Sequence, residues 1–81
     1  MNEEKIEQTI FNILKRIAPE SEPSELPPDE NIRRALDIDS FDALNFFIQL
    51  HEELGVEIPE SDYGQLNTVA EMRRYLADRL G

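Results

Sequence analysis

The stretch DSFDALNFFIQLHEELG, residues 39–55, predicts a helix with suitable residues at both of its ends. Asp39 is a favourable N-cap, because a side-chain oxygen at that position can accept a hydrogen bond from a free N–H of the first turn. Gly55 suits the left-handed conformation that often follows the last turn of a helix. We therefore expect a helix that begins at Asp39 as its cap and runs to about Leu54.

Apolar residues occupy two faces of this helix when successive positions are placed about 100° apart. One face, within about 100° of arc, suits a buried core and is formed by Ala43, Phe46, Phe47, Leu50 and Leu54. The other face, centred roughly 145° away, is formed by Phe41, Leu44 and Ile48. A small bundle has difficulty burying both faces, so we expect the second, beside Asn45 and Glu52, to stay partly exposed as a binding surface. The alternative is that the long connection or a short helix covers it.

The rest of the chain predicts two further main helices and one short helix. Asn2 can cap a first helix, which ends before Pro19. A last helix should begin at Val69, because Thr68 and Glu71 have the spacing of a capping box. Residues 60–65 can form a brief helix, which Gly64 weakens. The apolar stripes of the two outer helices are Ile6, Ile10, Ile13, Leu14 and Ile17, and Val69, Met72, Leu76 and Leu80.

Residues 18–38 form a long connection that contains four of the five prolines. Leu26, Ile32 and Leu36 are expected to anchor it, and residues 31–36 can form a helical turn. No segment shows the alternating pattern of a strand. The fold class is therefore all-α, a four-helix bundle with three main helices, one short third helix and a long loop between helices one and two. Residues 1–81 are expected to form a single domain.

Acidic residues dominate the composition and give a formal net charge of −10. Between Ala35 and Met72 there is no Lys or Arg, while the same stretch contains nine acids: Asp37, Asp39, Asp42, Glu52, Glu53, Glu57, Glu60, Asp62 and Glu71. This distribution argues against nucleic acid as a partner, because its binders carry basic patches. It favours partners with basic surfaces. The alternative is an acidic surface that only aids solubility.

Three features that the sequence lacks bear on where in the cell the protein acts. The sequence has no cysteine, so disulfides and thiolate metal sites are excluded. The first five residues are acidic and lack the apolar core of a signal peptide. No apolar run approaches the ~18 residues needed to span a membrane. We expect a cytoplasmic protein that does not insert into membranes.

Candidate catalytic and metal-ligating side chains are few. The only histidine, His51, lies roughly 16 Å along the helix from Ser40, which is too far for it to act as a base there. Asp37, Asp39 and Phe41 superficially resemble the start of a calcium-binding EF-hand loop. Asp42, however, replaces the Gly needed at the sixth position of such a loop, and Ile48 replaces the Glu needed at the twelfth. We therefore expect neither an enzyme nor a metal site.

Ser40 is the remaining candidate for a functional residue. It lies in the first turn of the helix, after a proline-rich loop, and is flanked by acids. Free N–H groups and the positive end of the helix dipole stabilise a phosphodiester at such a position. The alternative is that Ser40 only caps the helix. Ser21, Ser24 and Ser61 are weaker candidates, because none combines an exposed helix start with so acidic a flank.

The segment Asp39-Ser40-Phe41 resembles the Asp-Ser-Leu motif of acyl and peptidyl carrier proteins. The likeness extends from roughly residue 3 to residue 80, with matching spacing, through the segments PDEN (28–31), HEEL (51–54), VEIP (56–59) and NTV (67–69). The tripeptide alone is a weak signal, whereas the full set is specific. The resemblance implies that a phosphopantetheinyl transferase attaches 4′-phosphopantetheine from coenzyme A to Ser40, at a cofactor site that includes Asp39.

The resemblance also implies a function and partners. The thiol of the arm carries an acyl group as a thioester between enzymes, and the protein itself performs no chemistry. We expect a monomer that meets acyl-transferring or acyl-processing enzymes through their basic docking surfaces, in fatty-acid, lipid or polyketide-type biosynthesis. The residues expected to bind partners are Phe41, Asp42, Leu44, Ile48 and Glu52.

The sequence departs from the family pattern along this helix. Phe41 replaces the usual Leu, Asn45 and His51 stand where fatty-acid carriers commonly have acids, and Phe46 and Phe47 make the middle unusually aromatic. A specialised carrier therefore fits at least as well as the housekeeping fatty-acid carrier. Two alternatives remain, a stand-alone aminoacyl or peptidyl carrier and an unmodified helical interaction module. Loading by acyl- or amino-acid-activating enzymes separates the two kinds of carrier.

Overall fold

The structure is a computed structural model that describes residues 2–80; Met1 and Gly81 lie outside the described residues. The helical segments in chain order are α1 (Glu3–Ile17), η1 (Pro23–Glu25), α2 (Ile32–Ala35), α3 (Ser40–Leu54), η2 (Glu60–Gln65) and α4 (Val69–Leu80). Residues 2–80 contain no strand, so the expected all-α class is confirmed. Within the same range, no helix has both the length and the apolar character that a membrane span requires.

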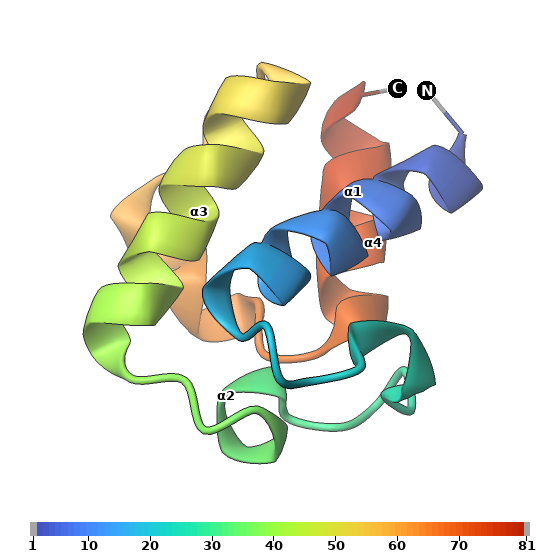
Figure 1. Cartoon of the computed structure of the whole chain (residues 1–81). Coiled ribbons are helices and arrows are strands. Elements are labelled where there is room, and N and C mark those ends of the chain that lie inside the picture. Colours follow the sequence, from blue (N-terminus) through green and yellow to red (C-terminus); the bar gives the residue numbers. More distant parts are fainter. Residues whose placement is uncertain (1, 81) are drawn as a thin grey trace.

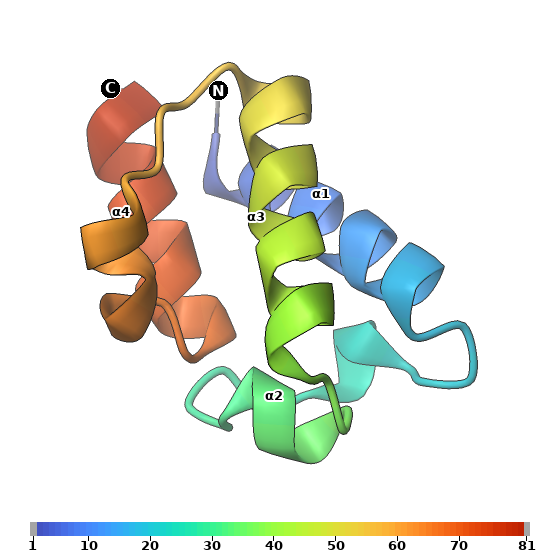
Figure 2. The ribbon, with the colours of Figure 1, turned by 90° about the vertical axis from the view of Figure 1, so that its left-hand side faces the viewer.

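The three long helices pack around one core. α1 contacts both α3 and α4; it crosses in front of α4 in Figure 1 and passes behind α3 in Figure 2. The start of α1 and the end of α4 lie at the same end of the bundle, while α2 lies at the other end, beneath the start of α3. The buried core consists of Ile6, Ile10, Ile13, Leu14, Ile32, Ile38, Phe46, Phe47, Leu50, Val56, Leu66, Val69, Met72 and Leu76. Ile17, Ala43, Leu54 and Leu80, expected in the apolar stripes, are only half-buried against it.

Side chains cap the long helices where the sequence predicts caps. Asn2 accepts a hydrogen bond from the Lys5 N–H at 2.8 Å. Thr68 Oγ1 accepts from the Glu71 N–H at 3.1 Å. The return bond of the predicted capping box is different, because Glu71 Oε1 accepts from the Asn67 N–H at 3.0 Å instead of from Thr68. Gly55 ends α3 with φ 67°, so the expected left-handed position is confirmed.

The connection between α1 and α3 is more structured than expected. The helical turn expected at residues 31–36 is present as α2, whereas η1 was not predicted. Two backbone hydrogen bonds attach this segment to the start of α4, from Ile32 N–H to the Asn67 carbonyl at 2.9 Å and from Ala70 N–H to the Pro28 carbonyl at 3.0 Å. The long connection is therefore held in place by the last helix of the bundle as well as by its own apolar anchors.

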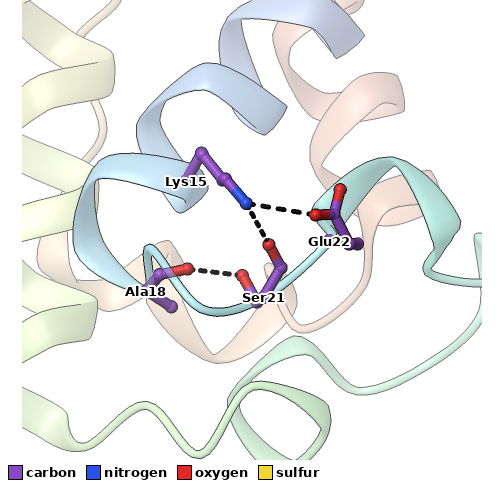
Figure 3. A network of polar contacts seen from close by, with 4 residues as sticks. All are labelled: Lys15, Ala18, Ser21 and Glu22. Atoms are coloured by element: carbon purple, nitrogen blue, oxygen red, sulfur yellow. Dashed lines mark hydrogen bonds and ion pairs between the residues drawn. The ribbon is translucent and has the colours of Figure 1, made fainter.

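A small polar network turns the chain just after α1 (Figure 3). Lys15 Nζ donates to the Ser21 carbonyl at 2.6 Å and to Glu22 Oε1 at 3.3 Å. Ser21 Oγ donates to the Ala18 carbonyl at 2.6 Å. The Ser21 hydroxyl is thus already engaged with the backbone.

η2 is the short third helix expected at residues 60–65, and it has 3₁₀ geometry. Its Tyr63 ring stacks on Phe47 of α3, with centroids 4.2 Å apart and planes inclined by 18°. Its Asp62 accepts hydrogen bonds from Tyr75 Oη at 2.6 Å and from Arg79 Nη2 at 3.2 Å, both on α4. Burial, followed by the hydrogen bond to Asp62, raises the pKa of the Tyr75 phenol. These contacts attach η2 to both neighbouring helices.

Candidate functional site

Ser40 is the first residue of α3, and its side chain is exposed. The residue that caps the helix is Asp39, whose Oδ1 accepts a hydrogen bond from the Asp42 N–H at 2.8 Å. The interpretation of Ser40 as a mere cap is therefore wrong. Its hydroxyl takes no part in the capping bond of the helix.

The start of α3 combines the positive end of the helix dipole with nearby carboxylates. Asp39 Oδ1 accepts a hydrogen bond from the Asp42 N–H at 2.8 Å, and the Asp39 carbonyl accepts one from the Ala43 N–H at 3.0 Å. The earlier N–H groups of a helix have no acceptor within the helix, and they carry the positive end of its dipole. A negatively charged group bonded to Ser40 would be stabilised by that end and repelled by the carboxylates of Asp39 and Asp42.

Arg33 of α2 reaches the same hydroxyl. Its Nη2 donates to Ser40 Oγ at 3.1 Å, and its Nε donates to the Ile38 carbonyl at 3.4 Å. The sequence does not predict this contact, because the contact depends on how the turn between α2 and α3 folds back. That turn contains Asp37, which has φ 53° and is the one non-glycine residue with positive φ within residues 2–80.

A cavity of about 340 Å³ opens beside Ser40. Its walls come from α1, α2, α3, η2 and α4, and most of them are apolar. Arg33 and Ser40 contribute to its lining, as do Leu14 and Met72 of the buried core. The remaining lining residues are Ile32, Ile38, Ala43, Leu44, Phe46, Phe47, Glu60, Tyr63, Gly64, Leu66 and Asn67.

The second apolar face of α3 is exposed, as predicted. Phe41 is 77% exposed, Leu44 45% and Ile48 46%. Glu52 is also exposed, and Asp42 is half-buried. Neither the long connection nor η2 covers this face, so the alternative arrangement is wrong. The role of these residues in binding partners stays a prediction.

Other candidate side chains lie apart from Ser40 or have other partners. His51 near the end of α3 has its Nδ1 2.9 Å from the Val56 carbonyl, so the ring helps to hold the end of the helix. Ser24 and Ser61 are exposed but belong to the 3₁₀ helices η1 and η2. Among residues 2–80, no group of three or more His, Asp or Glu side chains is placed to hold a metal ion.

Comparison with known proteins gives a consistent result. Residues 8–76 match the family described as "Phosphopantetheine attachment site". The acyl carrier protein of Lactobacillus acidophilus is 30% identical over 78 residues, which cover 93% of this chain and 98% of that protein. The meromycolate extension acyl carrier protein of Mycobacterium leprae is 36% identical over 55 residues, or 68% of this chain and 48% of that protein. The acyl carrier protein of Rhodococcus erythropolis is 34% identical over 55 residues and is matched over 60% of its length.

These relatives, the family match and the helical fold agree. Acyl carrier proteins hold 4′-phosphopantetheine covalently, perform no catalysis themselves and interact with the transferase that modifies them and with acyl-processing enzymes. The exposed hydroxyl of Ser40, the free N–H groups at the start of α3 and the nearby guanidinium of Arg33 fit such a group. With a family match over residues 8–76 and a relative aligned over almost its full length, this chain belongs to the acyl carrier proteins of the phosphopantetheine attachment-site family.

Proposed function

We propose that Ser40 is the residue that carries the 4′-phosphopantetheine arm. The observation that supports this most directly is that Asp39, and not Ser40, caps α3, which leaves the Ser40 hydroxyl exposed at the positive end of the helix. The residue also lies within the segment matched by the family. In the transfer, Ser40 Oγ bonds to the phosphorus next to the pantetheine half of coenzyme A, the adenosine bisphosphate half leaves, and the serine proton passes to a base of the transferase.

We also propose that the cavity beside Ser40 receives the first part of an acyl chain. Its volume of about 340 Å³ lies at the lower end of the roughly 300–1,000 Å³ typical of small-molecule sites. Leu14 and Met72 are apolar side chains of the core that line it. An alkyl chain gains free energy on leaving water for such a lining, whereas the ammonium group of an aminoacyl cargo would lose its hydration there. The cavity therefore favours an acyl cargo over an aminoacyl one.

The proposed docking surface is the exposed face of α3, formed by Phe41, Leu44 and Ile48 with Asp42 and Glu52 beside it. An exposed apolar patch with a polar rim commonly marks an interaction site. Neither of the two acids takes part in an ion pair among residues 2–80, so both charges are available to basic groups of a partner. We propose that the protein acts as a cytoplasmic monomer of one domain, in fatty-acid, lipid or polyketide-type biosynthesis.

A loading experiment tests this function. The chain is first converted to its phosphopantetheine form and then offered to an acyl-activating enzyme and, separately, to an amino-acid-activating enzyme. We expect a thioester with the acyl group and little or none with the amino acid. Ser40→Ala should accept neither, whereas the control Ser61→Ala, at an exposed serine of η2, should load normally. Preferential loading by the amino-acid-activating enzyme would show that the cargo class is wrong.

A further inference from the structure

The side chain of Arg33 is held in place directly beside the proposed attachment residue. Its Nε donates to the Ile38 carbonyl at 3.4 Å and its Nη2 to Ser40 Oγ at 3.1 Å, so two different atoms of one guanidinium are engaged. Both acceptors are neutral. A guanidinium has five N–H donors, and at least three therefore remain for another acceptor.

The positive charge of Arg33 is not neutralised by a carboxylate. Four ion pairs occur among residues 2–80, and they use Lys15, Arg16, Arg73 and Arg79. This is notable because Asp37, Asp39 and Asp42 all lie close to Arg33 along the chain. The Asp39 carboxylate instead caps α3, where it accepts a hydrogen bond from the Asp42 N–H at 2.8 Å. Arg33 thus lies among acidic residues without an ion-pair partner in residues 2–80, and it contacts a hydroxyl.

We propose that Arg33 binds the phosphodiester that is formed when Ser40 is modified, an inference that rests on Ser40 being the attachment site. The non-bridging oxygens of that phosphodiester are two bonds from Ser40 Oγ, so they lie within reach of the same guanidinium. A neutral acceptor is then replaced by an anionic one, and charge-assisted hydrogen bonds are roughly twice as strong as neutral ones. Arg33 also offsets the repulsion between the new charge and the carboxylates of Asp39 and Asp42.

The contact gives the arm a preferred starting direction. Arg33 and Ser40 both line the cavity of about 340 Å³. A phosphodiester held between the guanidinium and the start of α3 places the first atoms of the arm at the cavity mouth. Arg33 is therefore a positioning residue for the arm and does not take part in chemistry.

Arg34 provides a matched control. It is the next residue of α2, it is exposed and it carries the same charge. Its backbone N–H, and not its side chain, donates to Asn31 Oδ1 at 3.0 Å. Arg34→Gln therefore removes one positive charge from α2 without removing the contact to Ser40, whereas Arg33→Gln removes both.

The test measures the melting temperature before and after modification, at low ionic strength, for the unchanged chain, Arg33→Gln, Arg34→Gln and Arg33→Lys. Intact mass establishes that each preparation is modified at Ser40. For each protein, the measured quantity is the change in melting temperature caused by modification. We expect this change to be about 2–4 °C more negative in Arg33→Gln than in Arg34→Gln or in the unchanged chain. Arg33→Lys keeps the positive charge but lacks the planar guanidinium with its several N–H donors, so its change should lie between those of Arg33→Gln and the unchanged chain. The Arg33 Nε–H resonance of the unchanged chain should also shift on modification.

Two outcomes separate the possible failures. If Ser40 is modified but the three arginine variants and the unchanged chain all show the same change, and the Arg33 resonance does not move, Arg33 does not bind the phosphodiester. If mass spectrometry finds no modification at Ser40, the proposed attachment site itself is wrong, and this inference is overturned with it. Should Arg33→Gln fail to fold, the comparison between Arg33→Lys and the unchanged chain, together with the resonance, decides the question.

Discussion

Asp37 adopts a backbone conformation that is uncommon for a residue with a side chain. Its φ of 53° is in the left-handed region, which Asp tolerates better than β-branched residues do. The next residue, Ile38, donates its N–H to the Arg33 carbonyl at 2.9 Å. A left-handed residue followed by this bond to the third-last residue of the helix is characteristic of a Schellman ending, here of α2. This single residue therefore directs the chain from Arg33 back toward Ser40.

Substitution of Asp37 tests the importance of this turn. We expect Asp37→Val to lower the free energy of unfolding by about 1–2 kcal/mol, because a β-branched side chain is strained at positive φ. Asp37→Gly should change it little, since relief of the strain is offset by the greater freedom of glycine in the unfolded chain. Urea denaturation measures both. Asp29→Val is the control, at an exposed aspartate without positive φ. Equal stability of Asp37→Val and Asp37→Gly would contradict the turn geometry.

At the scale of the element, α3 presents two apolar faces to different surroundings. Phe47 is 6% exposed and Leu50 1%, whereas Leu44 and Ile48 are each nearly half exposed. The buried face packs against α1. The exposed face is continuous with Phe41 near Ser40. One helix thus contributes to the core with one face and leaves the other face exposed, and we propose that partners bind the exposed face.

Alanine substitutions distinguish the two faces. Phe47→Ala and Leu50→Ala should each cost about 2–5 kcal/mol of stability, because they leave cavities in the core. Leu44→Ala and Ile48→Ala should cost much less, since their side chains already contact water. The latter two should instead lower the kcat/KM of the phosphopantetheinyl transferase for this chain. Unchanged transferase kinetics with both exposed-face variants would remove the proposed docking surface.

Features that depend on nearby residues could be predicted from the sequence. The two faces of α3, its cap Asp39 and its left-handed Gly55 follow from spacing and residue type within one helix. The contact between Arg33 and Ser40 could not be predicted, because it requires a positive φ at Asp37 that the residue type does not demand. η1 was missed for a similar reason, since three residues carry no periodic signal.

At the scale of the whole molecule, charge is distributed unevenly. Two acids of the stretch between Ala35 and Met72 are paired with basic residues outside it: Glu53 with Arg16 at 2.9 Å, and Asp62 with Arg79 at 3.2 Å. The other seven acids of that stretch take part in no ion pair among residues 2–80. Their mutual repulsion opposes the compact state, and it is screened over about 10 Å at 0.1 M salt.

Added salt should therefore stabilise the protein. We expect the melting temperature to rise with sodium chloride and to rise further with magnesium chloride at equal ionic strength, because a divalent ion neutralises neighbouring carboxylates more effectively. The expected rise is gradual, through loose association with many acids. A melting temperature that stays constant or falls across a magnesium titration would contradict this account of the acidic surface.

The central claim is that the whole molecule serves to present one modified residue, Ser40. Its most direct test is the intact mass and peptide map of the chain after incubation with coenzyme A and a broad-specificity phosphopantetheinyl transferase. We expect the mass of a single phosphopantetheine, located on the peptide that contains Ser40, and no addition in Ser40→Ala. An unmodified chain under conditions that modify a known carrier, or an arm attached to Ser21, Ser24 or Ser61 instead, would contradict the claim.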